Sequence, residues 1–215
     1  MNSGQYKEKE NVLEISNTTV YNTLQAIEAS GFPMQTGVPI SGYGKEMPKR
    51  AYSLGQAEVG SGHDNYLSGI LVSFDVKYPL YWSPEFQRYH FAQIVSSQST
   101  MHRLTVVANS DTFNESFNKY VDLSIIEIVK SLAKEYNALV EAKADKEDIY
   151  VAFMKLRSNL PSGYEMWMHC TTNYLQLKTI YKQRRNHKLK EDWGAFCDWI
   201  ESLPMFMALT QKERE

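Results

Sequence analysis

Cysteine is scarce in this sequence. Its two cysteines, Cys170 and Cys197, are too few for a disulfide framework and fit a reducing compartment. Long apolar runs are also missing, since a run such as Ile70 to Val72 is far too short to cross a bilayer. The N-terminal residues have no apolar core after a basic region, so we expect no signal peptide. These absences predict a cytoplasmic protein without a membrane partner.

An excess of one charge is absent as well. The net charge of −2 and the pI near 6.2 give no electrostatic reason to expect nucleic acid as a partner. The sequence contains no G-x-S-x-G, no P-loop and no G-x-G-x-x-G motif. Its five histidines lack the paired spacing of a metal site. His169 and Cys170 are neighbours in a predicted strand and would point to opposite faces, which disfavours a Cys–His dyad.

The remaining composition, 43% hydrophobic and 22% charged, is that of a globular protein that can bury a core. Alternating polarity predicts strands over residues 69–82 and 163–173. Glycine and proline make residues 36–62 rich in loops. We predict an α+β fold with a single domain over residues 12–215 and a flexible N-terminus over residues 1–11. Helical periodicity and capping signals predict helices over residues 17–33, 48–54, 84–95, 123–143, 146–161, 173–186 and 190–204.

One polar stretch, residues 85–104, carries the first candidate site. A helix from Pro84 to Val95 would place polar side chains on one face. The following Ser96 to Thr100 offer hydroxyl and amide groups that suit a nucleotide, and His102 and Arg103 could supply charge for a phosphate. The alternative is a helix end whose serines satisfy free backbone groups.

A basic segment from Tyr181 to Lys188 carries the second candidate. Arg184 or Arg185 could reach an anionic ligand. The alternative is a solvated helix end, where positive side chains interact favourably with the helix dipole. Taken alone, this segment does not decide between the two interpretations.

Together, these segments resemble the flavin-dependent thymidylate synthases. Arg88 and Gln93 match the element before the family's signature, and Ser96 to Arg103 is similar to the end of that signature, S-x-N-E-x-S-x-R. Asn173, Leu177 and Arg184 keep the spacing of the family's N-x-R-x-L and of the arginine that follows it. The resemblance spans roughly residues 62–199. A group of bacteriophage proteins with similar strings at both segments resembles the chain more closely.

The sequence also departs from this family. Three residues after Gln93, where the family has the Arg-His-Arg that holds the flavin, the chain has Ser96-Ser97-Gln98. Leu175 stands in place of the arginine of N-x-R. Each lost charge-assisted hydrogen bond removes about 1.5–3 kcal/mol of flavin binding. We therefore expect no cofactor, and FAD in particular is doubtful.

The resemblance implies a flavin-dependent-thymidylate-synthase-like (ThyX-like) fold, a mixed sheet flanked by long helices, in a homo-oligomer that is a tetramer in the family. We predict a non-catalytic phage protein of the host cytoplasm that sequesters a nucleotide, such as a cyclic nucleotide of host antiviral immunity. The alternatives are a diverged synthase or related pyrimidine-modifying enzyme, and a purely structural or host-protein-binding phage product. Arg103 and Arg184 would neutralise phosphates, Gln93 and Gln98 would read a base or ribose, and Tyr89 or Tyr174 could stack. The predicted ligand-binding residues are Arg88, Gln93, Ser96, Ser97, Gln98, Ser99, His102, Arg103, Asn173 and Arg184.

Overall fold

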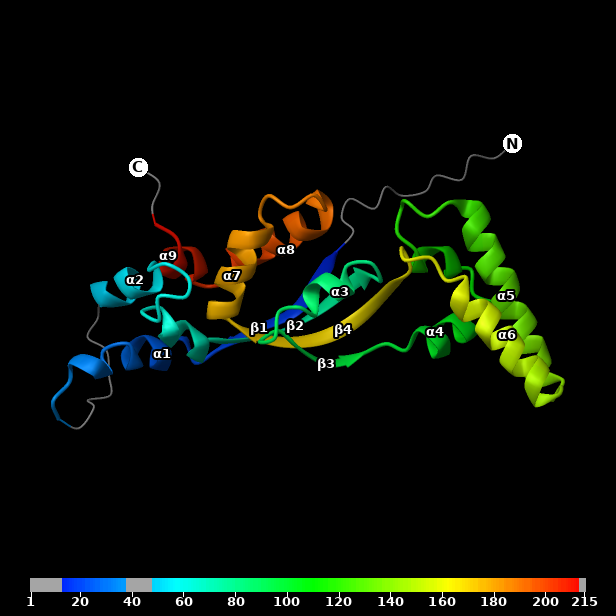
Figure 1. Ribbon diagram of the computed structural model, residues 1–215, viewed down its shortest axis with the longest axis horizontal. Coiled ribbons are helices and arrows are strands. Elements are labelled where there is room, and N and C mark those ends of the chain that lie inside the picture. Colours follow the sequence, from blue (N-terminus) through cyan, green and yellow to red (C-terminus); the bar gives the residue numbers. More distant parts are fainter. Residues whose placement is uncertain (1–12, 38–47, 213–215) are drawn as a thin grey trace.

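A four-stranded antiparallel sheet forms the middle of the molecule in the computed structural model, which describes residues 13–37 and 48–212 (Figure 1). The strand order is β1-β2-β4-β3. In β2 and β4 buried residues alternate with more accessible ones, the period expected when one face of a sheet is packed and the other is not. The strands are β1 (Glu14–Tyr21), β2 (Leu71–Pro79), β3 (Gln93–Ser97) and β4 (Glu165–Asn173).

Helices α3 (Ser83–Phe86), α7 (Tyr174–Arg184) and α8 (Lys190–Ser202) lie on one side of the sheet (Figure 1). Aromatic rings fill the space between them: Phe74 of β2 contacts Phe196 of α8 edge-on at 5.9 Å, and Trp82 stacks on Phe86 at 4.7 Å. All four side chains are fully buried. This side of the sheet therefore carries the hydrophobic core.

Two helical groups lie beyond the ends of the sheet (Figure 1). One contains α1 (Thr23–Ala29), α2 (Lys49–Gly55), α9 (Phe206–Thr210) and the short 3₁₀ helices η1 (Phe32–Met34) and η2 (Asn65–Gly69). The other contains α4 (Thr100–Val107), η3 (Phe113–Ser116) and an antiparallel pair, α5 (Leu123–Glu141) and α6 (Lys146–Ser158).

The predicted α+β class is confirmed, and so are both predicted strands and the helices α2, α5, α6, α7 and α8. The predictions for residues 1–11 and for part of the loop-rich segment lie outside the described residues. No helix in the described ranges is long and apolar enough to cross a membrane.

Two predicted helices are wrong in part. The helix expected over residues 84–95 ends at Phe86, and Gln93–Ser97 form β3 instead. Pairing with β4, about 75 residues later in the chain, outweighs the local helical pattern. The helix expected over residues 17–33 is limited to α1. Its first residues extend β1 instead, because the β-branched Thr18, Thr19 and Val20 suit a strand that pairs with β2.

A buried ion pair joins η2 to α7. The Lys178 ammonium donates to Asp64 Oδ2 at 2.6 Å and to the Ala57 carbonyl at 2.5 Å, and Lys178 and Asp64 are both buried. Asp64 directly precedes η2, and its carboxylate pairs with Lys178 and does not cap that helix. A buried charge needs such a partner, so this pair fixes the glycine-rich segment against the core.

Candidate functional site

The face of the sheet away from α3, α7 and α8 carries polar side chains. Residues directly opposite each other in an antiparallel ladder point to the same face. Ser73 lies opposite Thr171 and Asp75 lies opposite His169, while Phe74 and Cys170 form the buried pair between them. Figure 1 shows no helix over this second face in the part of the chain drawn as ribbon. We call it the open face.

A hydrogen-bonded chain crosses the open face from β1 to β4. Asn17 Nδ2 donates to Asp75 Oδ2 at 2.6 Å, and His169 Nδ1 lies 2.6 Å from Asp75 Oδ1. His169 Nε2 lies 3.0 Å from Ser73 Oγ. Because a carboxylate only accepts, Nδ1 carries the proton of the neutral ring, and Nε2 accepts from the serine hydroxyl. The hydrogen bond from Asn17, followed by that from His169, holds the pKa of Asp75 below its usual value.

The order Ser73–His169–Asp75 is that of a serine hydrolase triad, but nucleophilic catalysis also needs free donors for an oxyanion. Strand β2 pairs with β1 on one side and with β4 on the other. Its backbone N–H groups near Ser73 are therefore hydrogen-bonded within the sheet and are not free to bind an oxyanion. The hydrogen-bonded side chains of Ser73, His169 and Asp75 are therefore better suited to bind a ligand, through the oriented imidazole and the hydroxyl, than to form an acyl intermediate. Cys170 is no nucleophile either, since burial raises the pKa of its thiol to about 12.

Strand β3 forms the edge of the sheet beside this chain. Gln93 lies opposite Thr171 and Ser96 lies opposite His169, so both belong to the open face. Ser97 lies opposite buried Met168 and belongs to the other face, with a bulge between Ile94 and Ser96. All five residues of β3 are exposed.

Gln98 and Ser99 continue from β3 to α4. The backbone N–H of Gln98 donates to the Trp167 carbonyl at 2.9 Å, and its side-chain Oε1 accepts from Trp167 N at 3.0 Å. The Gln98 side chain therefore extends the β3–β4 pairing. Ser99 is exposed at the start of α4, where its side chain makes no capping hydrogen bond.

Arg103 points into the joint between α4, η3 and β4. Its guanidinium donates to the Glu165 carbonyl and, at 3.2 Å, to Ser116 Oγ, and it lies 5.6 Å from the centre of the Tyr164 ring. These contacts fasten the second helical group to the sheet. His102, one residue earlier, is exposed.

Arg184 lies on the covered side of the sheet, away from β3. It donates to Glu85 Oε2 at 2.9 Å and to the Tyr89 hydroxyl at 2.7 Å, and its guanidinium lies 4.6 Å from the centre of the Trp193 ring. Glu85 Oε2 also accepts from Trp193 Nε1 at 2.9 Å. The charge of Arg184 is thus neutralised within the chain, where it ties α3 and α7 to α8.

The other predicted residues have different surroundings. Arg88 is exposed after α3. Asn173 ends β4 and caps α7, since its Oδ1 accepts from Gln176 N at 2.8 Å. Tyr89 and Tyr174, which were expected to stack on a base, are buried.

The structure brings Gln93 and Ser96 together with Ser73, Asp75 and His169, and it places Arg103 and Arg184 elsewhere. Ser73, Asp75 and His169 were not among the ligand-binding residues predicted from the sequence. Their signal was the alternation in β2, where Ser73 and Asp75 separate the buried Val72, Phe74 and Val76. Alternation shows which residues share a face but not which strand lies next to them.

No protein-family model matches the chain, and no curated protein sequence matches it. Several solved structures are similar to it. A structure of thymidylate synthase X (ThyX) from Helicobacter pylori with FAD and dUMP has a TM-score of 0.62 and 17% sequence identity, and covers 93% of this chain and 97% of that chain. A second ThyX structure from the same organism, also complexed with FAD and dUMP, has a TM-score of 0.58 at the same identity and coverage.

The chain has the ThyX fold. The predicted ThyX-like fold is thereby confirmed, except that the sheet of the described residues is antiparallel and not mixed. At this identity the likeness concerns the fold alone. A flavin that binds as in the ThyX signature would require cationic donors at the positions of Ser96, Ser97 and Gln98, and these carry no charge. Arg103 and Arg184, which were predicted to bind phosphate, are engaged within the chain. Within the described residues, no group of three His, Cys, Asp or Glu is arranged to hold a metal ion.

Proposed function

We propose that this ThyX-fold protein binds a nucleotide on the open face of its sheet and does not convert it. The observation that carries the proposal is the juxtaposition of Gln93 and Ser96 of β3 with the Ser73–His169–Asp75 chain. These groups offer hydroxyl, amide and imidazole donors and acceptors on a surface that no helix of residues 13–37 and 48–212 covers (Figure 1). Such groups suit the edge of a base and the hydroxyls of a ribose.

Phosphate recognition needs positive charge near this surface. Arg103 and Arg184 were predicted for this role, but their intramolecular contacts would have to break first. Arg88 and His102 are exposed on either side of β3 in the sequence. We propose that Arg88 and His102 contact the phosphate, and that Arg103 and Arg184 hold the surrounding elements in place.

Binding without turnover is supported by the replacement of Arg-His-Arg by Ser96-Ser97-Gln98, because flavin chemistry needs a tightly held flavin. Sequestration is one function that a nucleotide-binding protein can perform without a redox cofactor. We propose a phage counter-defence protein of the host cytoplasm that removes a nucleotide signal, such as a cyclic nucleotide. This step rests on the resemblance to phage proteins and on analogy.

We further propose a homo-oligomer in which a second copy helps to cover the open face. Exposed apolar side chains border it, namely Tyr21 and Leu71 at one end and Val95 in β3. Exposed apolar patches on soluble proteins commonly mark interaction surfaces. Light scattering coupled to gel filtration tests the assembly; a strictly monomeric protein would contradict this part of the proposal.

Mass spectrometry of small molecules released when the purified protein is denatured tests the function directly, followed by calorimetry with mono-, di- and cyclic nucleotides. We expect a bound nucleotide whose affinity falls about tenfold in Ser96→Ala and in His169→Ala, the loss of roughly one good hydrogen bond. Ser131→Ala, an exposed serine on α5, is the matched control and should bind as wild type. Binding that is absent, or unchanged in both open-face variants, would refute the proposed site.

A flavin-dependent enzyme acting on a pyrimidine nucleotide is the second candidate. It is favoured by the fold, since the similar ThyX structures were solved with FAD and dUMP. The two candidates differ in colour: a flavoenzyme purifies with the visible absorbance of flavin or acquires it on incubation with FAD. Stoichiometric flavin uptake would favour the enzyme over the sequestering protein.

A further inference from the structure

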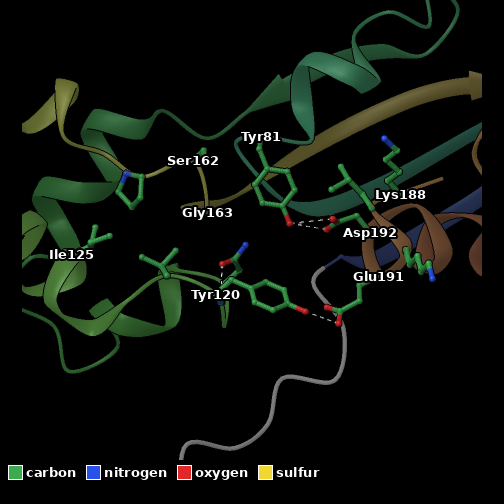
Figure 2. A pocket seen from close by; sticks show the side chains of 13 residues that line it. Tyr81, Tyr120, Ile125, Ser162, Gly163, Lys188, Glu191 and Asp192 are labelled. Carbon is green, nitrogen blue, oxygen red and sulfur yellow. Dashed lines mark hydrogen bonds between the residues drawn. The ribbon is translucent and has the colours of Figure 1, made fainter.

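The antiparallel helices α5 and α6 lie at one end of the molecule (Figure 1). A cavity of about 610 Å³ lies between the beginning of α5, where Ile125 lines it, and the beginning of α8 (Figure 2). The Tyr120 hydroxyl donates across this cavity to Glu191 Oε1 at 2.7 Å. The two helices therefore have surface that neither the sheet nor α8 covers.

One face of α6 packs within the chain. Ala152 and Leu156 are buried on this face. The ring of Phe153 lies 6.3 Å from the ring of Tyr136 in α5, measured between their centres. The residues that remain on the other side of α6 are thus free of the packing that holds the helical pair together.

A row of exposed side chains follows this other side of α6. Tyr150 and Met154 are 55% and 38% exposed, and Val151 beside them is 43% exposed. Glu147 and Arg157, also exposed, continue the row at its two ends. The spacing of three, four and three positions keeps Glu147, Tyr150, Met154 and Arg157 on one side of a helix. We call these four residues the α6 stripe.

Two ordinary explanations cover parts of the α6 stripe. Scattered apolar side chains are normal on a protein surface. The stripe has Glu147 in the first turn of α6 and Arg157 in its last turn, where both charges interact favourably with the helix dipole. Neither explanation accounts for the order of the four side chains, which is acidic, apolar, apolar and basic.

That order is self-complementary. Ala152 lies midway between Tyr150 and Met154, and it also lies midway between Glu147 and Arg157. A two-fold axis across α6 at this point would place a second α6 antiparallel to the first. Glu147 would then face Arg157 of the second copy, and Tyr150 would face Met154 of the second copy. An isologous contact between identical chains requires this kind of symmetry.

The charges at the ends of the stripe are available for such pairing. Among the ion pairs of residues 13–37 and 48–212, none involves Glu147 or Arg157. Lys155, by contrast, lies 3.7 Å from Glu135 of α5. A parallel second helix would bring like charges together at both ends, so the charges favour the antiparallel arrangement.

We propose that the α6 stripe binds a second copy of this chain, with the two α6 helices antiparallel about a two-fold axis near Ala152. Helix α6 has 13 residues and is about 20 Å long. It offers fewer residues than the roughly 20–30 per side of a stable interface, so we expect a dimer that dissociates on dilution. The contact does not use the open face, and neither surface depends on the other.

Sedimentation equilibrium of the full-length protein over a range of concentrations tests the proposal. We expect wild type to self-associate and Tyr150→Asp to weaken association at least about tenfold, because a charge enters the apolar centre twice per dimer. Glu147→Arg and Arg157→Glu should each weaken it about threefold to tenfold by placing like charges together at both ends. Asp148→Arg is the matched control, because it changes the same turn of α6 on another face and should leave association unchanged.

Combining the two charge reversals tests the pairing itself. The double variant Glu147→Arg with Arg157→Glu should associate as wild type does. An equimolar mixture of the two single variants should associate more tightly than either alone, since one carries only bases and the other only acids at these positions. Circular dichroism shows whether each variant is folded, and nucleotide binding at the open face should be the same in all of them.

Three results would overturn the proposal. The first is a wild-type protein that stays monomeric at every concentration. The second is an association that the stripe variants leave unchanged, or that Asp148→Arg weakens as much as Glu147→Arg does. The third is a failure of both the double variant and the mixture to recover association, because that would show that Glu147 and Arg157 do not face each other across the contact.

Discussion

The two faces of the same sheet differ in what covers them. On the covered face, Phe74 and Cys170 are completely buried, and Phe74 contacts Phe196 of α8. On the open face, one residue along each strand, Ser73 and His169 join a polar chain that remains partly accessible. Because side chains alternate along a strand, adjacent positions of one segment serve the core and a candidate ligand surface.

The difference also concerns charge. Arg184 and Glu85 on the covered side form an ion pair, and Glu85 accepts a hydrogen bond from Trp193. These interactions hold the helices of the covered side together. The polar groups of the open face bond to one another in a surface chain that a ligand could extend. We therefore expect substitutions on the covered side to change stability and substitutions on the open face to change binding.

The largest effect is expected for Phe74→Ala on the covered face. Truncating a fully buried phenylalanine should lower the free energy of unfolding by about 3–5 kcal/mol, because contacts are lost and a cavity remains. Ser73→Ala, the adjacent position, should cost less than about 1 kcal/mol. Urea denaturation measures both. Similar losses at the two positions would contradict the division of roles between the faces.

Arg184→Ala should lower the free energy of unfolding by about 2–3 kcal/mol, because it leaves Glu85 and Tyr89 without their charged partner. We expect nucleotide affinity at the open face to stay the same. Thermal unfolding and calorimetry on the same preparation test this. A loss of binding with stability intact would instead place Arg184 in the ligand site.

The stability of the protein should depend on pH through Asp192, which lies in the first turn of α8 on the covered side. Burial raises its pKa to about 6 in the folded state, so the folded protein keeps a proton that the unfolded chain has already lost. Stability should therefore fall by about 2–3 kcal/mol as the pH rises from about 4 to 6. Urea denaturation over this range measures the slope, and Asp192→Asn should remove it.

Asp75, on the open face, should show the opposite and smaller dependence. Its pKa is lowered in the folded state, so its contribution is present above the unfolded pKa and is lost as the pH falls through the folded pKa. Because the side chain is partly exposed, we expect less than about 1 kcal/mol. NMR titration of the carboxyl in wild type and in Asn17→Ala tests the cause. An unchanged pKa in that variant would show that Asn17 is not the main partner.

Local patterns in the sequence were sufficient for much of the fold. The helices α5 and α6 follow from their apolar periodicity and capping signals, and β2 and β4 from alternation. Strand β3 was missed because Gln93–Ser97 is short, polar and preceded by a strong helix start at Ser83-Pro84. Its structure depends on the free edge of β4, which no local pattern shows.

The sequence by itself determined the α+β class and the alternation that separates buried from accessible residues in β2 and β4, because both depend on neighbours within a few positions. Only the tertiary structure decided which polar groups meet. Asn17 reaches Asp75 across 58 positions, and Ser73 reaches His169 across 96. Those contacts depend on the register of β1, β2 and β4, and packing of the whole covered face fixes that register.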